Sequence, residues 1–186
     1  MTSSPIASPV PSDVTPTVSR PTHLDIALMG EASTSFRDQA GTGARLAATW
    51  WLSSFIGIRA SGGYRASSVN AAAARVTHFD GGAGIAARLY GSTDGFRVAV
   101  YGDVRLAREL VTRTREDGAD EHRAHTLPYV ALTGEAGLSL AHHLAGIFTL
   151  GTEVALGRTT LTVKESIVSS LPAATLNIGL GLRWSF

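Results

Sequence analysis

Residues 174–186 read ATLNIGLGLRWSF. From Ala174 to Phe186 every second residue is apolar, and the residues between them are small or polar, with Arg183 the single charge. A period of two places alternate side chains on opposite faces of a strand. The stretch therefore predicts a β-strand with one apolar face and one polar face.

The same alternation predicts seven further strands, at about 23–34, 42–51, 55–64, 77–90, 95–109, 126–140 and 147–157. The connections after the second, fourth and sixth strands are short, at 52–54, 91–94 and 141–146. Those after the third, fifth and seventh strands are long and polar, at 65–76, 110–125 and 158–172, and the first, 35–41, is intermediate. Short turns at one end and long loops at the other are typical of barrels in outer membranes.

Charged residues within the predicted strands fall on one face, and we expect none on the apolar face. They are seven acids and six arginines, which predicts a packed ionic network: Asp25, Glu31, Arg45, Arg59, Asp80, Arg88, Arg97, Asp103, Arg105, Glu109, Glu135, Glu153 and Arg183. A soluble barrel would turn its apolar face inward, whereas a membrane barrel turns it outward and keeps a polar lumen. The small residues between the charges favour the membrane barrel, because a crowded lumen needs small neighbours beside its ion pairs.

Aromatic residues near the strand ends support the same interpretation. The set that predicts two aromatic girdles at the membrane interfaces is Trp50, Trp51, Tyr64, Phe79, Tyr90 and Trp184. The predicted fold class is all-β: a closed, eight-stranded, antiparallel, up-and-down transmembrane β-barrel over residues 23–186, with short periplasmic turns and long outer loops.

Composition bounds the other possibilities. Residues 1–22 hold five of the seven prolines among many serines and threonines, which predicts a disordered linker or tail that cannot build a core. The balance of 16 basic against 15 acidic residues argues against a nucleic-acid partner, and the absence of cysteine excludes thiolate metal sites and cysteine nucleophiles. No stretch has the ~18–20 apolar residues of a spanning helix. No signal peptide is visible, so we expect one to have preceded Met1 in the precursor.

Residues 23–186 resemble the eight-stranded outer-membrane barrels of Gram-negative bacteria, of the OmpA transmembrane-domain and OmpX type. The most specific likeness is the alternating set Ile178, Leu180, Leu182, Trp184 and Phe186, which resembles the C-terminal signal read by the barrel-assembly machinery. The resemblance implies the bacterial outer membrane as location, with its lipids and lipopolysaccharide as surroundings. Residues 1–22, which the smallest members lack, imply a tether to a periplasmic or upstream domain.

Three functions stay open at this point. The first is a non-enzymatic membrane anchor, envelope stabiliser or surface-recognition protein, with the charged loop 110–125 as its exposed surface. The second is a small channel for ions or apolar solutes that passes through the ionic network. The third, a lipid A-modifying enzyme, is weak, because Ser139 and Glu135 lack a suitably placed histidine. A metal site from Glu121, His122 and His125 lacks the spacing of known zinc patterns, so no catalytic residue, cofactor or metal is assigned.

Overall fold

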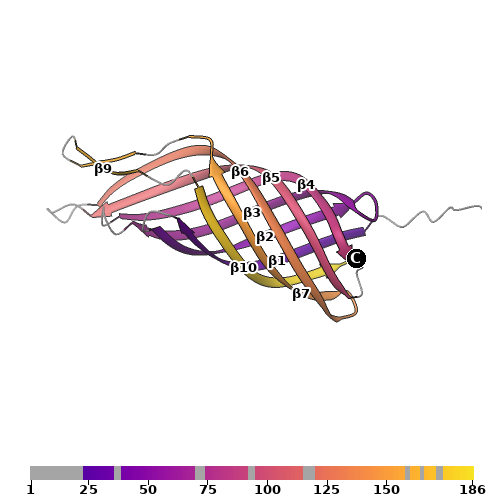
Figure 1. Ribbon diagram of the computed structural model, residues 1–186. Coiled ribbons are helices and arrows are strands. Elements are labelled where there is room, and N and C mark those ends of the chain that lie inside the picture. The colour runs from indigo at the N-terminus through magenta and orange to yellow at the C-terminus, as the bar shows by residue number, and fades with distance from the viewer. Residues whose placement is uncertain are drawn as a thin grey trace, which may run out of the picture.

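The computed structural model describes residues 23–35, 39–69, 74–91, 95–114, 120–157, 160–163, 166–170 and 174–186. Eight strands form one closed barrel (Figure 1). They are β1 (His23–Ser35), β2 (Gln39–Trp51), β3 (Ile56–Val69), β4 (Ala74–Gly91), β5 (Phe96–Thr114), β6 (Asp120–Ala141), β7 (Leu144–Ala155) and β10 (Ala174–Ser185). In the described part of the chain, no helix is long and apolar enough to cross a membrane.

The barrel is closed by the pairing of its first and last strands. Each strand pairs antiparallel with its neighbour along the chain, and β1 pairs with β10 from Asp25 opposite Ser185 to Ser35 opposite Thr175. Closure gives every strand a partner on both sides, so no backbone edge of the barrel faces lipid. The predicted all-β, eight-stranded antiparallel barrel is confirmed.

The remaining two strands form a small hairpin outside the barrel. They are β8 (Thr160–Val163) and β9 (Ser166–Ser170), which pair only with each other. The hairpin lies within the predicted long loop 158–172, at the end of the barrel opposite the C-terminus (Figure 1). We call that end the loop end, and the end with the C-terminus the turn end.

Several predicted boundaries are wrong. The segments 65–76 and 110–125, expected as loops, are mostly paired strand, because β3 continues to Val69 and β5 pairs with β6 as far as Thr114 opposite Asp120. The turn expected at 141–146 is only His142 and His143. Membrane crossing needs about 9–11 residues per strand, so much of β5 (19 residues) and β6 (22 residues) lies beyond the lipid. There neither face meets lipid, and the apolar alternation that reveals a strand disappears.

The two faces of the barrel wall differ in chemistry. Large apolar side chains point outward and are exposed, for example Leu132 (57 %), Leu180 (68 %) and Ile85 (69 %). Arginines and carboxylates of the same strands point inward and are buried, for example Glu135 on β6 and Arg183 on β10. An apolar outside around a charged inside is the arrangement of a membrane barrel and the reverse of a soluble one.

A glycine allows the barrel wall to close tightly between β4 and β5. A Cβ atom at Gly84 would overlap the carbonyl oxygen of Gly102 and would lie 2.5 Å from Oδ1 of Asp103. Gly62 differs, since its Cβ would meet only the carbonyl oxygen of Asp80, at 3.5 Å. Gly84 is therefore required for close approach, and Gly62 is not.

We expect Gly84→Ala to lower the free energy of unfolding by about 1–3 kcal/mol, because the added methyl group forces β4 and β5 apart. Urea unfolding in detergent micelles, followed by the mobility shift of the folded barrel on SDS gels, measures this loss. Gly62→Ala is the matched control and should leave the unfolding midpoint nearly unchanged. Equal midpoints for the two variants would contradict the tight contact at Gly84.

Candidate functional site

The interior of the barrel holds all thirteen charged residues predicted to face it. Ten are buried: Asp25, Arg45, Arg59, Arg97, Asp103, Arg105, Glu109, Glu135, Glu153 and Arg183. Glu31, Asp80 and Arg88 are intermediate in exposure, and their inward contacts are described below. The charges form two groups along the barrel.

The first group, the turn-end cluster, is centred on Asp25. Its carboxylate accepts hydrogen bonds from Trp51 Nε1 at 2.7 Å, Arg97 Nη1 at 2.7 Å and Ser185 Oγ at 2.6 Å. The donors come from β2, β5 and β10, so one carboxylate of β1 joins walls that lie far apart in the sequence. A buried carboxylate needs this number of donors to offset its lost hydration.

Glu135 on β6 completes the ion pairs of the turn-end cluster. It accepts hydrogen bonds from Arg97 Nη2 at 3.3 Å and Arg183 Nη1 at 2.5 Å. Together, Asp25 and Glu135 hold Arg97 between them, and Arg97 is 1 % exposed. This layer fills the barrel interior near its turn end.

Two further arginines of the turn-end cluster rest on aromatic rings. The Arg59 guanidinium carbon lies 3.9 Å from the ring centroid of Tyr101, and that of Arg88 lies 4.5 Å from the ring of Trp51. Arg88 Nη2 also lies 3.1 Å from His23 Nε2. A cation over an aromatic face is attracted to its negative quadrupole, so the rings supply part of the stabilisation that carboxylates give elsewhere.

The second group, the loop-end cluster, is centred on Arg45. It donates to Glu31 at 2.8 Å, to both oxygens of Asp80 at 2.7 and 3.1 Å, and to Glu153 at 3.4 Å. Glu153 also accepts from Arg65 Nη1 at 3.0 Å and Arg105 Nη1 at 2.5 Å. Forked guanidinium bonds of this kind fix both the position and the angle of the side chains.

Glu109 forms the outermost part of the loop-end cluster. It accepts a hydrogen bond from the Tyr129 hydroxyl at 2.5 Å, and its second oxygen lies 2.7 Å from His125 Nε2. His78 Nδ1 lies 3.5 Å from Glu109. His125, expected in a loop, is thus on β6 and faces the lumen. No group of three or more histidine, cysteine or acidic residues in the described part of the chain could hold a metal ion.

The two clusters carry opposite charge excess. The turn-end cluster has four arginines (Arg59, Arg88, Arg97 and Arg183) and two carboxylates (Asp25 and Glu135). The loop-end cluster has three arginines (Arg45, Arg65 and Arg105) and four carboxylates (Glu31, Asp80, Glu109 and Glu153). Asp103 lies between them, 2.7 Å from Arg105 and 4.0 Å from Arg59 Nε. The near balance of the interior therefore conceals an excess of arginines in the turn-end cluster and an excess of carboxylates among the paired residues of the loop-end cluster.

Most of the predicted aromatic girdle lies on the outer face, and one member does not. Trp50, Tyr64, Phe79 and Tyr90 are 43–68 % exposed, and Trp184 is intermediate. Trp51 is 0 % exposed, and its hydrogen bond to Asp25 places it inside the barrel. The assignment of Trp51 to the girdle is wrong, because strand alternation puts only one of two consecutive tryptophans on the lipid side.

We expect brominated phospholipids to quench the fluorescence of Trp50 strongly and that of Trp51 weakly, because only Trp50 reaches lipid. Two variants of the folded barrel in vesicles test this. One keeps Trp50 (Trp51→Phe with Trp184→Phe), and the other keeps Trp51 (Trp50→Phe with Trp184→Phe). Equal quenching of both would place Trp51 on the lipid side and contradict the structure.

The alternating apolar residues of β10, and Phe186 directly after it, lie on the outer face. Exposure is 46 % at Ile178, 68 % at Leu180, 39 % at Leu182 and 70 % at Phe186, while Trp184 is intermediate.

The sequence prediction missed two charged residues. Arg65 was placed in a loop, although it continues the inward alternation of Arg59, Ser61 and Gly63 on β3. The expected absence of charge from the apolar face was also wrong, since Arg108 on β5 pairs with outward-facing Phe79.

Comparisons with known proteins identify the fold. No family model matches the chain, and no curated protein matches its sequence. Among solved structures, Neisserial surface protein A superposes with a TM-score of 0.59 at 11 % identity, over 89 % of this chain and 97 % of that one. A major outer membrane protein from Thermus thermophilus gives 0.62 at 15 % identity, over 87 % and 99 %. Ail, the attachment invasion locus protein of Yersinia pestis, gives 0.54 at 10 % identity, over 89 % and 97 %.

These matches cover nearly the whole of each solved chain, so the similarity extends over the complete barrel rather than a few strands. At such low identity they establish the fold alone. Together with the apolar outer surface and the ionic interior, they show that this chain is an eight-stranded β-barrel with the fold of the small outer-membrane barrels of the OmpA and OmpX type.

Proposed function

We propose that the chain is an integral protein of the bacterial outer membrane that acts, without enzymatic activity, as a membrane anchor, envelope stabiliser or surface-recognition protein. In this proposal outer-membrane lipids and lipopolysaccharide surround the barrel. The barrel-assembly machinery engages the alternating residues of β10, and residues 1–22 link the barrel to a periplasmic or upstream domain. The support for the anchoring role comes from the charged residues inside the barrel.

The observation that carries the proposal is that paired charges fill the lumen. Arg97, Arg183 and Arg45 are each at most 3 % exposed, and each donates to carboxylates on other walls of the barrel. An eight-stranded barrel has an interior just wide enough for side chains to fill. Because breaking a buried ion pair leaves an uncompensated charge, these layers support a structural plug rather than a route for ions.

Planar-bilayer recordings of the purified barrel test the proposal. We expect a quiet baseline at salt concentrations and voltages at which an open aqueous pore gives resolved steps. The mobility shift of unboiled samples on SDS gels confirms that the protein in the recording is folded. Reproducible unitary steps from folded protein would overturn the plug and favour the channel.

A separate measurement tests the absence of enzymatic activity. Lipid A incubated with the folded barrel in micelles should keep its mass, as measured by mass spectrometry. Loss or gain of an acyl chain would make the protein a lipid-modifying enzyme. The conductance measurement tests the plug, and the mass measurement tests the absence of enzymatic activity. Either result can contradict its part of the proposal without affecting the other.

A further inference from the structure

Among the described side chains, the outer face of the barrel carries two charges, and both are arginines near the loop end. Among the outward-facing side chains that the structure describes on the eight barrel strands, only Arg75 and Arg108 are charged. Both are exposed, and neither forms an ion pair or hydrogen bond with a described residue. A lone charge on a lipid-facing surface is unfavourable at mid-membrane and tolerated at the interface.

Their neighbours place the two arginines at that interface. Arg108 on β5 is paired with Phe79 on β4, and the Phe79 ring lies 5.1 Å from the ring of Tyr64. Arg75 lies four residues further toward the loop end of β4, opposite Ser68 of β3. Aromatic side chains of this kind sit at the level of lipid headgroups, so both guanidiniums lie at or just beyond the headgroups.

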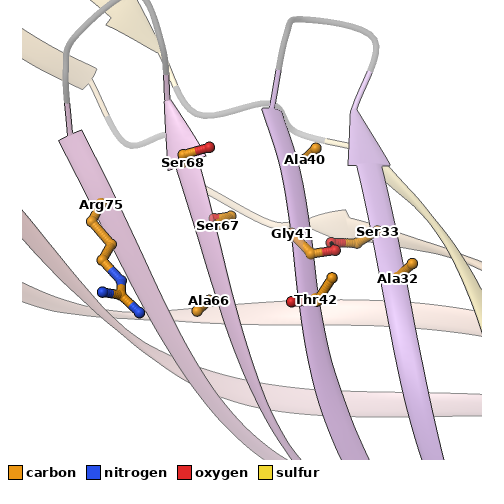
Figure 2. A pocket seen from close by; sticks show the side chains of 9 residues that line it. All are labelled: Ala32, Ser33, Ala40, Gly41, Thr42, Ala66, Ser67, Ser68 and Arg75. Carbon is orange, nitrogen blue, oxygen red and sulfur yellow. Dashed lines mark hydrogen bonds between the residues drawn. The ribbon is translucent and has the colours of Figure 1, made fainter.

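A hollow of about 580 Å³ lies next to Arg75. Its outward-facing lining consists of small side chains from β1, β2 and β3, namely Ala32, Ala40, Thr42, Ala66 and Ser68, with Arg75 at one edge. In Figure 2 the guanidinium of Arg75 lies level with Ala66, beside the row of small residues. On β5 and β6 the outer surface carries large side chains such as Leu106 and Leu132, so this area is recessed relative to those strands.

We propose that Arg75, Arg108 and the hollow form a binding site for a phosphorylated glycolipid of the outer leaflet. The two arginines bind its phosphates, and one acyl chain lies along the small residues. Guanidinium groups form forked hydrogen bonds with phosphate. Four residues along the strand and one spacing between neighbouring strands separate the Cα atoms of the two arginines by about 14 Å, a distance that a disaccharide with a phosphate at each end spans. This inference rests on the proposed location in the outer membrane.

Native mass spectrometry of the barrel in micelles, with diphosphorylated lipid A or phosphatidylcholine added, tests the charged half of the site. We expect the wild type to retain lipid A in preference to phosphatidylcholine. Arg75→Gln and Arg108→Gln should each weaken retention about fivefold, and the double variant about 25-fold. Arg123→Gln is the matched control, since Arg123 is exposed at the same end but lies on the inward-facing side of β6. Equal retention by all four variants would overturn the proposal.

A second pair of variants tests the hollow. Ala66→Leu fills it and should lower lipid A retention, whereas Ala60→Leu adds the same bulk to the outer face of β3 away from it. Retention unaffected by Ala66→Leu would overturn the acyl-chain contact. Complete displacement of lipid A by inorganic phosphate would identify a simple anion site instead. Concentration-dependent dimers that Ala66→Leu abolishes would make the hollow an interface between two copies of the chain.

These outcomes are independent of the proposed function. A barrel that conducts no ions and leaves lipid A intact, but binds lipid A equally with and without the two arginines, retains its role as an anchor and lacks the lipid site. A barrel that conducts ions but loses lipid A on Arg75→Gln retains the lipid site and lacks the plug.

Discussion

Asp25→Asn should lower the free energy of unfolding of the barrel by about 3–5 kcal/mol, the usual loss when one partner of a buried ion pair is removed. Asp25 is 2 % exposed and accepts hydrogen bonds from Trp51, Arg97 and Ser185. The turn-end cluster already has more arginines than carboxylates, so the variant leaves Glu135 to balance four guanidiniums. Urea unfolding in micelles, followed by gel mobility and tryptophan fluorescence, measures the loss.

Asp80→Asn is the matched control in the loop-end cluster. Its partner Arg45 keeps Glu31 and Glu153, and that cluster has an excess of carboxylates. We therefore expect less than half the loss seen for Asp25→Asn. Adding Arg97→Met to Asp25→Asn should recover much of the stability, because removing both members of a buried pair is far less harmful than removing one. Equal losses for the two aspartates would show that the unequal charge distribution has no energetic effect.

The period of two over all eight predicted strands was sufficient to predict the barrel because lipid and lumen impose opposite chemistry on the two faces of each strand. Leu176, Ile178 and Leu180 point to lipid, and Asn177 points to the interior, as the alternation requires. The inward position of the charged residues follows from the same rule. The partner of each arginine does not follow from that rule, because these ion pairs join residues as far apart as Asp25 and Arg183 and depend on the register of closure.

Two of three errors occur where the alternation of apolar and polar residues loses its physical cause, and the third comes from not applying the alternation. Beyond the membrane most residues on both faces of β5 and β6 are polar, Leu110 and Val111 excepted, so the sequence indicated a loop where the strands remain paired. Trp51 was assigned to the outer aromatic girdle because it is a tryptophan. It is two residues from Thr49 and therefore on the same face of β2, and Thr49 is buried on the inner face. Arg75 fell in a predicted loop, and only its pairing with Ser68 reveals that it points outward. Following the alternation along each strand would have placed Trp51 correctly. It would not have revealed the paired ends of β5 and β6 or the strand position of Arg75.

Leu180→Arg should reduce the stability of the membrane-inserted barrel by about 2–4 kcal/mol, the cost of an arginine on the lipid face at the midplane. Leu180 is 68 % exposed and lies near the middle of β10, paired with Gly30 of β1 and Phe148 of β7. Refolding from urea into phosphatidylcholine vesicles, without assembly machinery, measures the loss as a shift in the unfolding midpoint. Using vesicles keeps the result separate from any recognition of β10 during assembly.

Leu156→Arg provides the depth control for this experiment. Leu156 is 61 % exposed, nearly as much as Leu180, but it follows the end of β7 at the loop end of the barrel. The lipid-face penalty for arginine falls to about 0–1 kcal/mol near the interface, so this variant should refold almost like the wild type. If both leucines tolerated arginine equally, the outer face of β10 would not be in contact with the membrane interior. If both were equally damaging, the hydrocarbon would extend as far as Leu156, and the arginines proposed to bind lipid phosphate would lie too deep to meet headgroups.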